Sequence, residues 1–216
     1  MKKYYIAPVI ASLATPLAAI AESEQVTPIG AQTAATASAK LDFQITIPRV
    51  LFLQVGSGSN LANNTKVDLI DFTVPVGNVG DGSVVAASAA SGDLGTGAVT
   101  VRLMANGAST VSLNSNVTQL NNGSGSNVGW NRIAVASAPL TTGMTAGYNN
   151  TGITHPAFAA SNTGDGQPTN IAAVNGTVRE EGKWTFTYRN QDILAAGTYG
   201  GVNTKGGRVI YTATMP

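Results

Sequence analysis

The chain has 216 residues, of which twelve are lysine or arginine and eleven are aspartate or glutamate, and it contains one histidine and no cysteine. This near balance of charge provides no net attraction for nucleic acid or anionic lipid. The absence of cysteine excludes disulfides, thiolate metal sites and thiol nucleophiles. Only 11% of the residues are charged, and Gly, Ala, Ser, Thr and Asn are frequent, which is typical of secreted β proteins and surface fibres.

Residues 1–21 have the pattern of a cleaved signal peptide. Two lysines near the start precede an apolar stretch that two prolines interrupt, and Ala19, Ile20 and Ala21 form a small-residue cleavage site. We therefore expect export through the periplasm to an extracellular or cell-surface location, with a mature chain that begins at Glu22. Without the two signal-peptide lysines, ten basic residues remain against eleven acidic ones. No later stretch approaches the roughly 20 apolar residues of a membrane span.

Residues 22–40 are small and polar, and Val26 and Ile29 are their only branched aliphatic residues. One interpretation is a flexible N-terminal segment, because chain ends are often poorly ordered. The other is an exchangeable donor strand, in which Val26 and Ile29 would be the candidate donor residues.

The next segments alternate between apolar and polar residues with the period of a strand. Residues 41–47 are predicted to form a half-buried strand, Pro48 to interrupt it, and residues 49–55 to resume it. Further strands are predicted over residues 67–76 and 97–105. Weaker strand candidates cover residues 83–87, 110–113, 131–137 and 171–178. Clusters of Gly, Asn and Ser separate these segments, as expected for turns.

The stretch "WTFTYRN" begins with Trp184, Phe186 and Tyr188 on one face of a strand. A single helical turn could follow in residues 190–196. Leu194, Gly197 and Tyr199 then have the spacing of a tyrosine corner, in which the phenol hydroxyl bonds to nearby backbone. We expect Tyr199 to be structural for this reason.

The last strand is predicted in "GGRVIYTATMP", where Val209, Tyr211 and Ala213 share one face. About nine strands separated by turns, with no sustained helical period, indicate an all-β protein. We predict a single immunoglobulin-like, Greek-key β-sandwich domain over residues 41–216.

Residues suited to catalysis are sparse. His155 is the only imidazole, and no nucleophile or metal-binding motif surrounds it. Asp68 and Asp71 lie an odd number of residues apart and would point to opposite faces of a strand, and Glu180 and Glu181 resemble a charged turn. We therefore predict a protein that is not an enzyme and that has no catalytic residue, no metal ligand and no cofactor.

The stretches "WTFTYRN", "LAAGTYGG" and "GRVIYTATMP" resemble the ends of exported pilin-like or fimbrial subunits of Gram-negative bacteria, with a weaker likeness in "LDFQITIPRVLFLQVG". The resemblance implies an immunoglobulin-like domain that polymerises when the N-terminal strand of a neighbour completes its sheet. It also implies self-association into adhesive fibres, with a periplasmic chaperone and an outer-membrane usher as partners.

Two kinds of function follow as hypotheses. The first is a structural or adhesive fimbrial-type subunit, whose donor is residues 26–37 with an extension into Leu41 and Phe43, and whose acceptor edge lies beside residues 209–213. The alternative is a self-contained secreted carbohydrate-binding module that uses Trp130, Tyr148 or the long loop around His155. A secreted hydrolase is disfavoured because no acid and base pair is evident.

Overall fold

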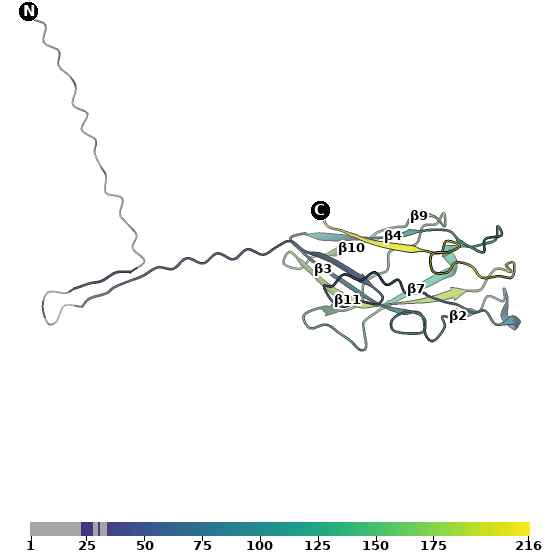
Figure 1. Ribbon diagram of the computed structural model, residues 1–216, viewed down its shortest axis with the longest axis horizontal. Helices are drawn as coiled ribbons and strands as arrows, with labels where there is room; N and C mark the ends of the chain where they lie inside the picture. Colours follow the sequence, from purple (N-terminus) through teal and green to yellow (C-terminus); the bar gives the residue numbers. More distant parts are fainter. Residues whose placement is uncertain (1–22, 28–29, 31–33) are drawn as a thin grey trace, which may run out of the picture. The chain divides into compact units, whose positions relative to one another are not determined.

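The computed structural model describes residues 23–27, 30 and 34–216, so the predicted signal peptide lies outside the described residues. Two compact units are distinguished, one ending at Ile47 and the other spanning Pro48–Pro216. All strands of the described residues belong to the second unit (Figure 1). No helix in this described part of the chain has the length and apolar character needed to cross a membrane.

One layer of the second unit, called sheet A, is built around its two longest strands (Figure 1). These are β3 (Ala98–Asn106) and β11 (Thr177–Arg189), which pair antiparallel from Thr177 opposite Asn106 to Thr185 opposite Ala98. On the other side of β3, β1 pairs antiparallel, and β11 also pairs with β2, β7 and β8. The bounds of these further strands are β1 (Leu51–Val55), β2 (Val84–Ala86), β7 (Ile133–Ala138) and β8 (Asn149–Asn150).

The second layer, called sheet B, has β4 (Thr110–Val117) at its centre. On one side of β4 lie β10 (Thr169–Ala172) and the two-residue β9 (Gly164–Asp165). On the other side lies β12 (Val209–Thr214), the last strand. A separate two-stranded ribbon and two short 3₁₀ turns complete the elements. They are β5 (Leu120–Asn121), β6 (Asn127–Val128), η1 (Val76–Asn78) and η2 (Trp130–Arg132).

The core lies between the two sheets because alternate residues of each strand point inward. Its buried centre is the fully buried Trp184, surrounded by aliphatic residues of β3 and β4. The indole Nε1 of Trp184 donates a hydrogen bond of 2.6 Å to the carbonyl oxygen of Ile153, which satisfies its polar atom. The aliphatic residues are Val99, Val101, Leu103, Val111 and Leu113.

The outer face of sheet A carries a buried ion pair. Glu181 is fully buried, and its carboxylate lies 3.0 Å from Nε of Arg102. The backbone N–H of Thr145 donates to the same carboxylate at 3.0 Å, while Arg102 donates to the carbonyl of Gly143 and to the side chain of Gln54. The pair therefore fastens a loop over this face. The prediction of a charged turn at Glu180 and Glu181 is wrong, because both lie within β11.

The predicted all-β class is confirmed, since antiparallel sheets pack into a β-sandwich. Two predicted strands are absent. Residues 67–76 keep their alternating burial but join no ladder and end in η1. Residues 41–47 precede the compact unit, and they form no strand because no described segment pairs with them. The helical turn considered for residues 190–196 is also absent.

Candidate functional site

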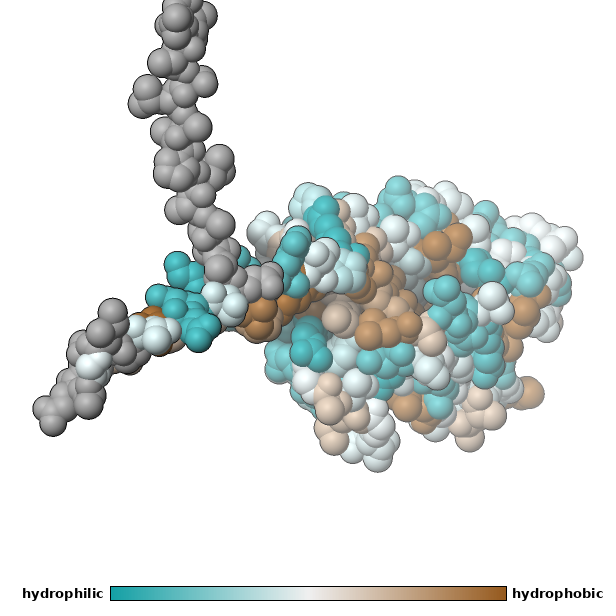
Figure 2. Space-filling view, turned by 60° about the vertical axis from the view of Figure 1, so that its left-hand side comes forward, coloured by the Kyte–Doolittle hydropathy of each residue, from teal (hydrophilic) through white to brown (hydrophobic). Residues whose placement is uncertain are grey.

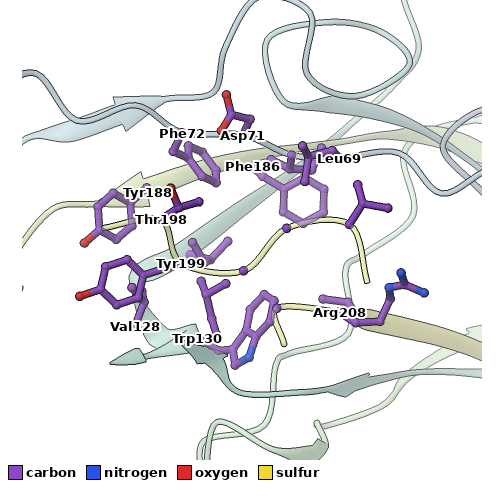
Figure 3. Close-up of a pocket in the computed structure, with 18 of the residues that line it drawn as sticks. Leu69, Asp71, Phe72, Val128, Trp130, Phe186, Tyr188, Thr198, Tyr199 and Arg208 are labelled. Atoms are coloured by element: carbon purple, nitrogen blue, oxygen red, sulfur yellow. The ribbon is translucent and has the colours of Figure 1, made fainter. Parts of the chain in front are cut away.

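An open groove of about 960 Å³ runs beside the last strand of the sandwich (Figure 3). Leu69 and Phe72 lie on one side of it, and Val128, Trp130 and Arg208 lie on the other (Figure 3). Its volume is at the upper end of the range of about 300–1,000 Å³ that is usual for binding sites. A space-filling view shows apolar side chains among hydrophilic ones on one face of the second unit (Figure 2).

The first wall of the groove is β12, which contains the predicted acceptor edge. Val209, Tyr211 and Ala213 point inward and pack against the core, yet each is only half-buried. On the paired strand β4, the inward residues Val111 and Leu113 are completely buried. One edge of β12 pairs with β4, and no described strand pairs with its other edge. Within the described part of the chain, one edge of β12 thus has no strand partner, and its inward side chains remain partly exposed.

The opposite wall is the extended segment 66–74. Ile70, Phe72 and Val74 alternate inward and pack against the core, while Leu69 is exposed. Backbone N–H groups of residues 88 and 92 donate to carbonyls of residues 71 and 69 and hold the segment in place from one side. The alternation that predicts a strand here is thus genuine, but the segment has no ladder partner on the groove side among the described residues.

One end of the groove is formed by the residues of the predicted tyrosine corner, all three of which line it. The hydroxyl of Tyr199 lies 2.8 Å from the carbonyl oxygen of Ala195, four residues upstream, and 2.8 Å from Oγ of Ser126. Leu194 packs beside Tyr199 on the apolar cluster at this end. Gly197 has a φ of 153°, a backbone conformation that favours glycine.

His155 lies beneath the groove, against β12. Its Nε2 is 2.7 Å from the hydroxyl of Tyr211, and its ring meets the ring of Trp184 edge-on at a centroid distance of 4.6 Å. Burial lowers the pKa of His155 to about 4 and raises the pKa of Tyr211, so both are neutral at pH 7. A neutral imidazole hydrogen-bonded to a neutral phenol ties the loop to β12.

The lowered pKa of His155 makes the stability of the folded chain depend on pH. The pKa of His155 is about 4 in the folded chain, below its ordinary value of 6.5. The unfolded chain therefore binds more protons between these two values, and stability decreases as the pH falls from about 6.5 towards 4. The His155 contribution is fully present above this window.

The acidic residues weighed for catalysis each bind a different partner and do not face one another across a common site. Asp68 accepts hydrogen bonds from Ser57, and these help to hold the pKa of Asp68 below its usual value despite partial burial. Asp71 accepts from Ser88, and Glu181 is paired with Arg102. Within the described residues, no three His, Asp or Glu side chains lie close enough together to hold a metal ion.

The residues predicted to contact sugars do not form a common surface. Trp130 is only 5% exposed, its Nε1 donates to the carbonyl of Thr118, and its ring packs on Phe158. Trp130, in η2, therefore presents no open ring face for stacking on a sugar, because Phe158 and the neighbouring apolar residues cover its ring. Tyr148 lies outside the groove lining, and its hydroxyl donates to Asn60 at 2.7 Å.

The predicted donor segment is placed only in part. Val26 is exposed, and Ile29 lies outside the described residues. A stronger feature follows in residues 41–47, here called the arm, whose four apolar side chains alternate and are 76–85% exposed. The row consists of Leu41, Phe43, Ile45 and Ile47. The predicted domain of residues 41–216 includes the arm, and the predicted extension of the donor reached only Leu41 and Phe43, although the alternation continues through Ile45 and Ile47.

The fold and the groove define an antiparallel β-sandwich with an open side and an apolar arm. Comparison of the chain with protein-family models, curated proteins and solved structures found no match. Function must therefore be inferred from the groove and the arm themselves.

Proposed function

We propose that this protein is a non-enzymatic subunit of an extracellular adhesive fibre, and that it assembles by addition of a β-strand from one copy to the sheet of another. The observation that carries the proposal is that an open apolar groove occurs on the same chain as an exposed apolar arm with which no described segment pairs. Strand addition satisfies both, because the incoming backbone hydrogen-bonds to the free edge of β12 while alternate side chains fill the groove.

The arm has the chemistry that the groove requires. Its apolar side chains recur at every second residue, so a strand of this sequence presents all four on one face. The groove contains aromatic and aliphatic side chains, including Phe72, Phe186 and Tyr188. Burying one Leu, Ile or Phe side chain contributes roughly 1.5–3 kcal/mol, so the row supplies a substantial driving force for docking.

The predicted export of the chain agrees with the same function. The predicted signal peptide would deliver the chain to the periplasm, and the low charge content is typical of surface fibres. An exposed apolar row and an unpaired sheet edge are aggregation hazards before assembly. This hazard is the reason to propose a periplasmic chaperone and an outer-membrane usher as partners.

The test compares substitutions on the two faces of the arm, in the full mature chain of residues 22–216. Phe43→Asp and Ile45→Asp place a carboxylate in the apolar row, whereas Gln44→Asp and Thr46→Asp place the same charge on the other face. Molar mass is measured by light scattering, and filaments are sought by negative-stain microscopy. We expect the native chain and the Gln44→Asp and Thr46→Asp chains to assemble. The Phe43→Asp and Ile45→Asp chains should remain monomeric.

A peptide of residues 38–48 provides an independent test of whether the arm binds in the groove. Because a ligand that binds only the folded state raises its stability by mass action, this peptide should raise the melting temperature of the Phe43→Asp chain. The same peptide carrying Phe43→Asp is the control. A native chain that stays monomeric at all concentrations, together with a peptide that has no effect, would falsify the proposed function.

A further inference from the structure

Asn106, the last residue of β3, holds the chain immediately after the arm. Its side-chain oxygen accepts a hydrogen bond of 2.6 Å from the backbone N–H of Val50, and its side-chain nitrogen donates one of 2.8 Å to the carbonyl of Pro48. Its backbone N–H also donates to the carbonyl of Val50 at 3.1 Å. Three hydrogen bonds, here called the Asn106 clamp, thus continue the pairing of β1 with β3 back to Pro48.

The groove could be filled in two ways, by the arm of the same chain or by the arm of a second copy. Filling by the same chain requires a tight reversal between Ile47 and Leu51, because Leu53 and Val55 of β1 already line the groove. Tight two-residue hairpin turns need positive φ values, which Gly and Asn adopt readily. The three residues available for this turn are Pro48, Arg49 and Val50, and none of them has a positive φ.

The backbone restrictions of Ile47 and Pro48, the two residues at the start of such a turn, oppose the reversal. Proline fixes its own φ near −65°, and its ring restricts the preceding residue, Ile47, to extended conformations. A turn through Val50 would also break the Asn106 clamp and leave the partly buried N–H of Val50 without its acceptor. Self-filling is therefore costly, while filling by another copy leaves every bond of the clamp intact.

We infer that the Asn106 clamp reserves the arm for the groove of a second copy of this chain. This inference rests on the proposed function and deepens it, because it names the residue that keeps the arm available to a second copy. Asn106 acts here as a positioning residue, since it contacts the chain next to the arm and does not contact the groove.

The experiment lengthens the connection between Ile47 and Pro48, here called the hinge, which joins the arm to the sandwich. A flexible insert of eight Gly and Ser residues between Ile47 and Pro48 spans about 16 Å on average, which allows the arm to turn back. The matched control carries the same insert between Ala37 and Ser38, upstream of the arm, and leaves the clamp unchanged. Both are full mature chains, compared with the native chain at about 10 µM by light scattering.

We expect the native chain and the upstream insertion to assemble and the hinge insertion to be monomeric. A short flexible linker gives an effective concentration in the millimolar range, so self-filling should be favoured on the order of 100-fold at this protein concentration. Adding Phe43→Asp to the hinge insertion should then lower its melting temperature, because the filled groove loses an apolar side chain. Asn106→Ala in the native chain should raise the fraction of monomer.

The outcomes separate this inference from the proposed function. A hinge insertion that assembles as fully as the native chain would overturn the role of the clamp and leave assembly by strand addition standing. The hinge insertion could also be monomeric and have a melting temperature that Phe43→Asp does not change. Its groove would then be empty, and this result would contradict the inference. A native chain that never assembles would remove the proposed function and the inference together.

Discussion

Removal of the Glu181 carboxylate should destabilise the sandwich by about 3–5 kcal/mol, because it leaves a buried arginine without its counter-charge. The charged atoms of Glu181 and Arg102 are 3.0 Å apart, and both side chains are buried. At an effective dielectric constant of about 20, this separation corresponds to an attraction of about 5 kcal/mol. In the intact pair, the desolvation of both groups offsets most of that attraction. Glu181→Ala loses the attraction and retains the desolvation of Arg102.

The double substitution Arg102→Met with Glu181→Leu should recover most of this loss. It removes both charges and fills the space with apolar side chains, and such replacements of buried pairs are often neutral or stabilising. The N–H of Thr145 then lacks its acceptor, so recovery is expected to remain incomplete by about 1–3 kcal/mol.

Urea unfolding provides the assay, with each substitution placed on the Phe43→Asp background so that assembly does not contribute. Glu180→Ala is the matched control on the same strand, because Glu180 accepts from Asn149 at the surface and should cost about 1 kcal/mol or less. A loss below about 1.5 kcal/mol for Glu181→Ala would refute the reasoning. The reasoning would also be refuted if Glu181→Ala and the double substitution lowered the free energy of unfolding by the same amount.

Three further predictions concern the core and its turns. Lowering the pH from 7 to 5 should destabilise the native chain by about 1–2 kcal/mol more than His155→Gln, because the folded histidine resists protonation; parallel pH profiles would contradict this. Tyr199→Phe should cost about 1 kcal/mol in urea unfolding through the loss of its hydrogen bonds, and an unchanged midpoint would argue against a structural role. Gly182→Ala should cost about 1–3 kcal/mol, because the added Cβ would lie 2.5 Å from a backbone atom of a neighbouring loop. Gly77→Ala, which meets no atom within 4 Å, serves as its control and should change the melting temperature little.

Period-two alternation predicted which side chains face the core better than it predicted hydrogen-bonded strands. Trp184, Phe186 and Tyr188 lie on the buried face of β11, as their spacing indicates. Residues 67–76 have the same signal without a ladder, because alternation records burial on one face and carries no information about a neighbouring backbone. The arm shows the extreme case, in which the pattern is complete and the described residues supply neither partner nor cover.

Long-range polar contacts could not be predicted from local patterns. Glu181 is joined to Arg102 across 79 positions of sequence, so its burial depends on strand pairing and not on its neighbours. His155 similarly enters the core through contact with Tyr211, 56 residues away. Trp130 could be placed only as a tryptophan near a turn, and the ring of Phe158 that covers it comes from the long loop.

The arm and the groove of the described residues are two different surfaces. In the proposed assembly, each contact would join the arm of one copy to the groove of the next, so every added copy would leave one free groove at one end and one free arm at the other. Such an assembly has a direction and no intrinsic length. Its growth would end only when a protein that offers a groove without an arm, or an arm without a groove, occupies the last position.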